Sequence, residues 1–174
     1  MTCVTNLKQI SLAFQLWDGD NGDNYPMELS MTNGGAMELA LAGDVAGIFR
    51  TMSNELNTPK ILICPQDTKR TAATDFAVGF SNANISYFVG LDANHKSPQM
   101  ILSGDDNFVV NGKPIQSGVL NLWTNASVKW TFKRHHYAGN IALTDGSVRS
   151  EIPRKELQQA FQQTGLATNR LAIP

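Results

Sequence analysis

The 174-residue chain has few charged residues and no excess of either sign. Charged residues make up 17% of the sequence, with 14 Lys and Arg against 15 Asp and Glu, whereas about 25% is usual in globular proteins. The basic residues form no stripe or block that would neutralise the phosphates of a nucleic acid or bind anionic lipid. We therefore expect no nucleic-acid partner.

Long hydrophobic runs are also missing. A membrane-spanning helix needs about 20 consecutive apolar residues, and no window of this sequence approaches that length or resembles a signal peptide. Hydrophobic residues nevertheless make up 42% of the chain, which is enough for a full core in one domain of roughly 150 residues. We expect residues 1–174 to form a single soluble domain.

Apolar residues at helical spacing open the chain. They recur every three or four positions over 5–17, which predicts a helix with one buried face. Two glycines, a proline and short polar residues then predict a loop over 18–26. A second helix is expected over 45–56, with a short helix over 36–42 before it. The residues that define the first buried face are Leu7, Ile10, Phe14 and Trp17.

Short β-type runs follow Pro59 and predict an antiparallel sheet. The clearest of them form an expected three-stranded meander, which reverses at Ala138-Gly139 and again at a two-residue turn of Asp145-Gly146. A final helix is expected to start at Pro153. The fold class is therefore α+β, with an N-terminal helix on an antiparallel sheet. The expected strands occupy 61–63, 85–89, 100–102, 108–110, 119–123, 128–136, 140–144 and 147–152.

Three carboxylates, those of Asp18, Asp20 and Asp23, lie within six residues after the first helix. An oxygen-rich flexible loop suits Ca²⁺. The spacing is not that of an EF-hand, because Gly22 and Leu29 stand where that motif needs an oxygen ligand and a bidentate Glu. The same residues suit a solvated loop that ends a helix, so both interpretations stay open.

The cysteines and histidines form no zinc-binding pattern. Cys3 and Cys64 either form one disulfide or are two buried thiols. His135 and His136 are adjacent, so in a strand they point to opposite faces. A nucleophile built from Cys64, His135 and Asp145 is the least favoured interpretation, because nothing around Cys64 in Ile-Leu-Ile-Cys-Pro lowers the pKa of its thiol.

A longer pattern surrounds these histidines. Residues 135–148, HHYAGNIALTDGSV, place nine residues between His135 and the pair Asp145-Gly146. Gly146 permits the positive φ of a tight turn, and Asp145 favours that turn. The arrangement looks like the H-X9-DG motif of bacterial prepilin-like proteins that begin with a cleavage and methylation segment.

Two further segments support the same resemblance. Residues 63–67, ICPQD, are similar to the family's Cys-Pro-Ser-Asp element, with Gln66 in place of Ser. Residues 3–10, CVTNLKQI, with the following acidic loop and Tyr25-Pro26, are similar to the stretch just after the family's membrane helix. The resemblance reaches from residue 3 to about residue 152.

The resemblance implies a pseudopilin, whose N-terminal helix is anchored in the inner membrane by its first half and packs on a periplasmic sheet by its second half. The expected function is a non-enzymatic structural subunit of a type II secretion-like or type IV pilus-like assembly. Its expected partners are other pseudopilins or secretion-system components, and the prepilin peptidase on the full-length precursor. The membrane-spanning half of the helix is expected to be missing from this sequence.

The resemblance carries over no catalytic role and no cofactor. His135, Asp145 and Gly146 are therefore expected only as motif positions, and the domain is expected on the periplasmic face of the inner membrane or in an extracytoplasmic filament. That oxidising setting, with the first helix lying across the sheet, favours a disulfide between Cys3 and Cys64 over two buried thiols. The alternative function is a periplasmic calcium- or glycan-binding module, and a Cys/His hydrolase is less favoured.

Overall fold

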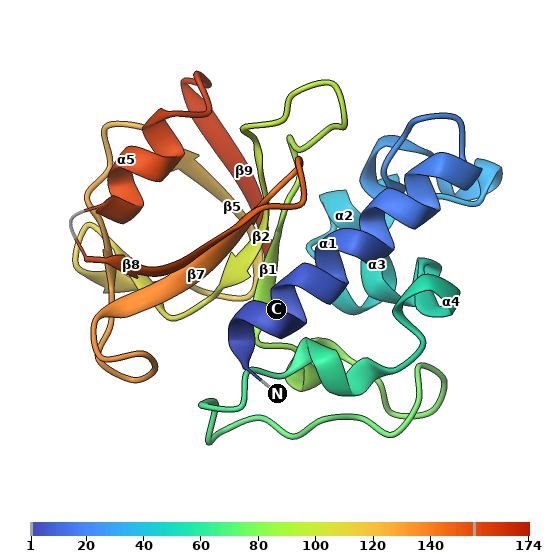
Figure 1. Ribbon diagram of the computed structural model, residues 1–174, viewed down its shortest axis with the longest axis horizontal. Helices are drawn as coiled ribbons and strands as arrows, with labels where there is room; N and C mark the ends of the chain where they lie inside the picture. Colours follow the sequence, from blue (N-terminus) through green and yellow to red (C-terminus); the bar gives the residue numbers. More distant parts are fainter. Residues whose placement is uncertain (1, 155) are drawn as a thin grey trace.

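The computed structural model describes residues 2–154 and 156–174, and it places helices before strands along most of the chain (Figure 1). A long first helix is followed by short α-helices and 3₁₀ turns, and one further helix lies near the C-terminus. The helical elements are α1 (Cys3–Asp20), η1 (Pro26–Glu28), η2 (Met31–Asn33), α2 (Met37–Leu41), α3 (Val45–Thr51), α4 (Ser53–Leu56), η3 (Pro59–Leu62), η4 (Asn82–Asn84) and α5 (Glu156–Gln162).

The strands form two antiparallel sheets. The larger has the order β5-β9-β1-β2-β7-β8, and the smaller has the order β4-β3-β6. The fold class is therefore α+β, as predicted. The strands are β1 (Tyr87–Gly90), β2 (Ile101–Asp105), β3 (Phe108–Val110), β4 (Lys113–Pro114), β5 (Gly118–Trp123), β6 (Val128–Trp130), β7 (Ala138–Leu143), β8 (Val148–Pro153) and β9 (Thr168–Ile173).

Both faces of the larger sheet are covered. On β1, Tyr87 and Val89 belong to the core shared with α1 and the short helices, whereas Phe88 belongs to the core shared with α5 and the smaller sheet. Successive side chains of a strand point to opposite faces, so such alternation is what a sheet between two cores requires. Figure 1 shows α1 and α5 on opposite sides of β1 and β2.

The first helix follows the predicted pattern and is longer than predicted. Leu7, Ile10 and Phe14 are fully buried, and α1 contacts β2, β7 and β8. The helix continues to Asp20, because the low propensity of a terminal glycine costs only about 1 kcal/mol. The side chain of Asn21 then donates to the carbonyl of Trp17 at 2.7 Å, which satisfies one of the free carbonyls at the helix end. No helix in the described part of the chain is both long and apolar enough to span a membrane.

Two predictions about the first half of the chain are wrong. Residues 61–63 are not a strand, because Pro59 opens the 3₁₀ helix η3, which the Thr58 side chain caps. The expected helix over 45–56 is interrupted at Met52, which separates α3 from α4.

The predicted three-stranded meander is also wrong in part. Strand β6 ends at Trp130 and pairs with β3, whereas β7 starts at the expected reversal and pairs with β8 and β2. Gly139 is needed because its backbone lies against the Trp130 ring, at a position where a Cβ would meet ring atoms at 2.6 Å. Pro153 ends β8 and does not open the last helix.

Strand β9 was not predicted. It lies between β5 and β1 and pairs with both. Its alternate residues Leu171 and Ile173 are buried with α5, and Ala172 is buried with α1. A late, short segment therefore joins the edge strand β5 to the rest of the sheet.

Candidate functional site

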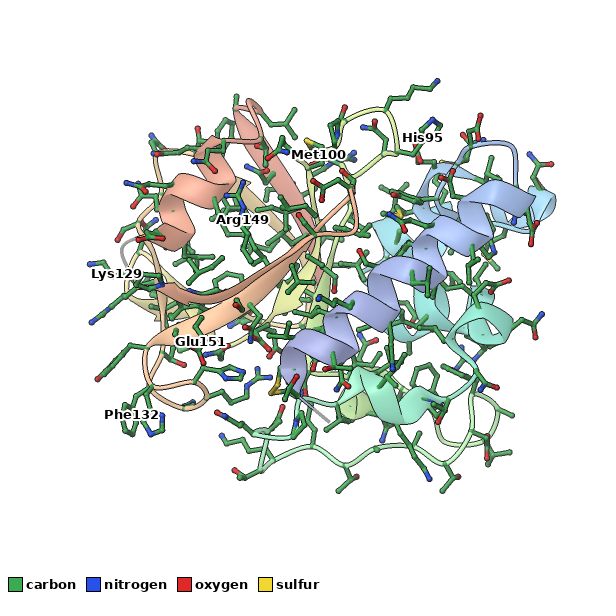
Figure 2. All side chains as sticks on the ribbon, viewed as in Figure 1. His95, Met100, Lys129, Phe132, Arg149 and Glu151 are labelled. Atoms are coloured by element: carbon green, nitrogen blue, oxygen red, sulfur yellow. A yellow bond between two sulfur atoms is a disulfide. The ribbon has the colours of Figure 1, made fainter. Side chains whose placement is uncertain are left out.

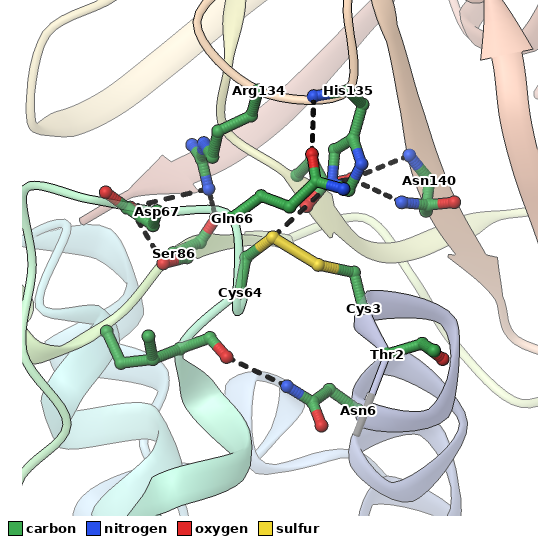
Figure 3. Close-up of a disulfide and its surroundings, with 12 residues drawn as sticks. Thr2, Cys3, Asn6, Cys64, Gln66, Asp67, Ser86, Arg134, His135 and Asn140 are labelled. Atoms are coloured by element: carbon green, nitrogen blue, oxygen red, sulfur yellow. Dashed lines mark hydrogen bonds and ion pairs between the residues drawn. A yellow bond between two sulfur atoms is a disulfide. The ribbon is translucent and has the colours of Figure 1, made fainter.

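His135 lies in the loop between β6 and β7 and not in a strand. Three consecutive residues of this loop, His135, His136 and Tyr137, have left-handed backbone φ values of 53°, 45° and 67°. Non-glycine residues adopt this conformation rarely and at a cost, and such residues cluster at functional sites. The bend turns the His135 side chain toward the start of α1 (Figure 3), while Phe132 stands exposed on the outer side of the loop (Figure 2).

The predicted disulfide between Cys3 and Cys64 is present, with the two Cα atoms 5.2 Å apart. Both cysteines are buried. The bridge ties the first residue of α1 to the segment after η3, and not to the end of a strand as expected. The Asn6 side chain strengthens the same junction by donating to the carbonyl of Ile63 at 2.8 Å.

The His135 imidazole lies against this disulfide. Its Nε2 atom is 3.4 Å from the sulfur of Cys64 and 3.4 Å from Oδ2 of Asp105. The backbone N–H of His135 donates to the side-chain carbonyl of Gln66 at 3.0 Å. Gln66, which departs from the Ser of the resembled element, therefore holds the histidine loop in place.

Asp105 is fully buried at the end of β2. Its Oδ2 atom accepts hydrogen bonds from the backbone N–H and the side-chain amide of Asn140, both at 2.8 Å. Its Oδ1 atom is buried and has no hydrogen-bond partner among the described residues. One ligand atom each from Cys3, Cys64, Asp105 and His135 lie within 4.8 Å of one another.

A buried ion-pair network adjoins this cluster. The Arg134 guanidinium contacts the carboxylate of Asp106, lies 3.5 Å from that of Asp67, and donates to the carbonyl of Ser86 at 3.2 Å. Arg70 pairs with the same two carboxylates, at 2.7 Å for Asp106 and 3.1 Å for Asp67. Two guanidiniums thus share two carboxylates.

Burial and neighbouring charges shift the pKa values of Arg134 and Asp67. Burial lowers the pKa of Arg134. The negative charges of Asp105 and Asp67 raise this pKa but do not outweigh burial. Burial by itself raises the pKa of Asp67. The hydrogen bond from the Lys69 backbone, the charge of Arg134 and the hydrogen bond from Ser86 outweigh burial, so the pKa of Asp67 lies below its ordinary value.

A cleft of about 560 Å³ opens beside the network. Lys69, Lys133 and Arg70 line it together with apolar residues that include Phe108 and Ile115. Of the three tryptophans, Trp17 and Trp130 are buried, whereas Trp123 is exposed on strand β5.

The other end of the sequence motif is a turn. Asp145 and Gly146 lie in the four-residue connection 144–147 between β7 and β8, and not in a two-residue turn. Gly146 has the predicted positive φ, +82°. Asp145 accepts from the backbone N–H of Ser147 at 2.8 Å, and hydrogen bonds from the side chain and backbone of Ser147 lower the pKa of Asp145. The six residues of β7 separate this turn from His135 by roughly 17–20 Å.

The structure brings together two of the three acidic-loop residues. Asp18 and Asp23 lie with His95, and one ligand atom of each is within 4.8 Å of the others. Asp20, the last residue of α1, is outside the cluster. Nδ1 of His95 is 2.7 Å from the backbone carbonyl of Asp23 and 3.5 Å from Oδ1 of Asp18. Burial raises the pKa of Asp18. The charge of His95 lowers this pKa but does not outweigh burial. Figure 2 shows His95 beside the C-terminal end of α1.

Sequence reasoning missed Asp105 and His95. The run Gly104-Asp105-Asp106-Asn107 has the composition of a turn, but Asp105, Asp106 and Asn107 are buried. The sequence signal that could have pointed to Asp105 was this run of polar residues between two apolar strands. His95 carried no signal, because 72 positions separate it from Asp23.

Comparisons with family models, curated proteins and solved structures found no match to this chain.

Proposed function

We propose that the chain is a non-enzymatic, pseudopilin-like structural subunit of a type II secretion-like or type IV pilus-like assembly. The three sequence segments that resemble prepilin-like proteins support this proposal. The order of one long N-terminal helix followed by an antiparallel sheet, with the helix packed on the sheet, agrees with it.

The observation that carries the proposal is the outward face of α1. Leu12 and Leu16 are 53% and 51% exposed, although Leu7, Ile10 and Phe14 on the opposite face are fully buried. Residues four positions apart lie together on a helix surface. Two exposed leucines beside each other on this helix suit packing against the equivalent helix of a neighbouring subunit.

The disulfide agrees with the expected location. Disulfides persist in oxidising compartments and are rare in the cytosol. The Cys3–Cys64 bridge also fastens the first turn of α1 to the domain.

The test is assembly of the full-length gene product in a bacterium with a prepilin peptidase and a filament-forming secretion system. We expect peptidase processing and recovery in the sheared filament fraction. The double variant Leu12→Gln, Leu16→Gln is expected to be processed and exported but absent from filaments. Leu41→Gln, which changes an equally exposed leucine on α2, is the matched control. Absence of processing, or equal assembly of all three proteins, contradicts the proposal.

A periplasmic calcium-binding module is the second candidate, because Asp18 and Asp23 converge with His95. Calcium at a hundred times its Kd stabilises a folded protein by about 2.7 kcal/mol. We expect a calcium-dependent rise in Tm that Asp23→Asn removes and Asp20→Asn retains. A Tm that does not respond to calcium removes this candidate.

A further inference from the structure

Four metal-ligand side chains from distant parts of the chain meet at the start of α1. Cys3 opens α1, Cys64 follows η3, Asp105 ends β2, and His135 comes from the loop before β7. One sulfur, oxygen or nitrogen atom of each lies within 4.8 Å of the others. Two thiolates with an imidazole and a carboxylate form a donor set that suits tetrahedral Zn²⁺.

The orientation of His135 favours a metal site over a nucleophile, base and acid arrangement. In such an arrangement the carboxylate and the nucleophile address different nitrogens of the histidine. Here the Cys64 sulfur and Oδ2 of Asp105 both lie 3.4 Å from Nε2. Because both groups approach the same nitrogen, the histidine cannot pass a proton from the thiol on one nitrogen to the carboxylate on the other. The arrangement instead resembles ligands around one ion.

The spacing of these donors also fits. Zinc bonds of about 2.0–2.3 Å to nitrogen, oxygen and sulfur, at tetrahedral angles, place the donor atoms roughly 3.3–3.8 Å apart. The two distances around Nε2 of His135 lie in that range. The two sulfurs are bonded in the oxidised chain and separate to non-bonded contact once that bond is broken.

Of the two carboxylate oxygens of Asp105, Oδ2 is the one that lies 3.4 Å from Nε2 of His135. Asp105 is fully buried, its Oδ1 atom has no hydrogen-bond partner among the described residues, and Asn140 fixes its orientation through two hydrogen bonds. The nearby guanidiniums of Arg70 and Arg134 form their ion pairs with Asp67 and Asp106, as described above. Asp105 forms no direct ion pair with either guanidinium among the described residues, and its nearest cationic partner is the His135 imidazole when that ring is protonated.

We propose that the reduced chain binds one Zn²⁺ ion through Cys3, Cys64, Asp105 and His135, and that forming the disulfide releases it. Binding converts two thiols into two zinc-bound thiolates and sends two protons to solvent. An oxidant that carries a disulfide then accepts two electrons from the two thiolates and takes up two protons, becoming a dithiol, while the Cys3–Cys64 bond forms. The metal thereby protects the two thiols until the chain is oxidised.

The test uses the whole chain, reduced with dithiothreitol and freed of reductant under anaerobic conditions. Zn²⁺ binding is measured by calorimetry. Co²⁺ serves as a second probe, because thiolate ligation gives a charge-transfer band and tetrahedral geometry gives intense visible absorption. We expect one Zn²⁺ per reduced chain, both cobalt signatures, and no binding at this site in the oxidised chain.

Variants separate this site from adventitious binding by two cysteines. His135→Ala and Asp105→Asn are each expected to weaken zinc binding by at least about tenfold and to change the cobalt spectrum. His136→Ala, which changes the adjacent exposed histidine, is the matched control and is expected to bind as the unchanged chain does. His95→Ala is expected to leave binding unchanged, which distinguishes the site from the Asp18, Asp23 and His95 cluster.

Three outcomes overturn the proposal. The reduced chain takes up no Zn²⁺, or His135→Ala and His136→Ala bind equally well, or the oxidised chain binds as tightly as the reduced one. If reduction unfolds the chain, as circular dichroism would report, added Zn²⁺ must restore the folded spectrum. Failure to restore it also counts against the site.

Discussion

Replacing Gly146 by Val tests the turn that joins β7 to β8. Gly146 has a φ of +82°, and its N–H donates to the carbonyl of Leu143 at 3.0 Å to close the loop. A left-handed conformation costs a non-glycine residue roughly 1–2 kcal/mol, and a β-branched side chain fits it poorly. A Cβ there would also meet Nε2 of Gln15 at 2.9 Å, but Gln15 is exposed and can move away.

We therefore expect Gly146→Val to lower the free energy of unfolding by about 1–2 kcal/mol. For a chain of this length that corresponds to a fall in Tm of roughly 2–8 °C. Urea unfolding followed by tryptophan fluorescence gives the free energy, and calorimetry gives Tm. The loss is expected to be the same when Gln15 is also changed to Ala, because the strain is in the backbone.

Gly146→Asn is the matched variant, since Asn tolerates the left-handed region better than other non-glycine residues. It is expected to lose clearly less stability than the Val variant. Equal Tm values for the Val variant and the unchanged chain would refute the placement of this turn. Recovery on removal of Gln15 would show that side-chain crowding, and not backbone conformation, sets the cost.

The remaining predictions concern the bridge and the buried ion pairs. Replacing Cys3 and Cys64 by Ser removes a bridge across 61 positions. Loop entropy predicts that the free energy of unfolding falls by at most about 4 kcal/mol. Equal unfolding curves of the oxidised chain and this variant would contradict this prediction. Arg134→Met leaves the buried carboxylates of Asp67 and Asp106 with only one of their two guanidinium partners and is expected to cost up to about 3–5 kcal/mol. The half-buried Arg149, changed to Met, should change Tm little, and similar losses in both variants would disprove a special role for the buried network. The lowered pKa of Asp67 stabilises the fold above the ordinary Asp pKa of about 3.9, and this contribution is lost as pH falls through the folded-state pKa. Asp67→Asn should therefore flatten the acid limb of stability against pH, and an unchanged acid limb would contradict the assignment.

Features that depend on local periodicity or on one residue's conformational preference were predictable from the sequence. The three-and-four spacing of Leu7, Ile10 and Phe14 predicted the buried face of α1, because a helix of 3.6 residues per turn places such residues on one side. Gly146 predicted a left-handed turn residue for the same local reason. The class, helices followed by antiparallel strands, also follows from these local patterns.

The pairing of the strands could not be predicted from local patterns. Strand β6 has a β-type pattern, but nothing local distinguishes pairing with β3 from pairing with β7. Gly139 suggested a turn in the sequence, whereas the structure requires glycine there because the backbone lies against the Trp130 ring. Strand β9 was missed because its pairing partners, β5 and β1, lie far away along the chain.

Some residues of the candidate site were identified from the sequence, whereas the contacts between them were seen only in the structure. Cys3, Cys64 and His135 were identified from the sequence, and the resemblance supported a bridge between the first two. The meeting of His135 with Asp105, and of His95 with Asp18, depends on loops that approach each other only after the sheet and helices have packed. A sequence pattern reports the period and chemistry of neighbouring residues. The contacts between residues distant along the chain result from burying two cores on one sheet, which only the folded chain as a whole decides.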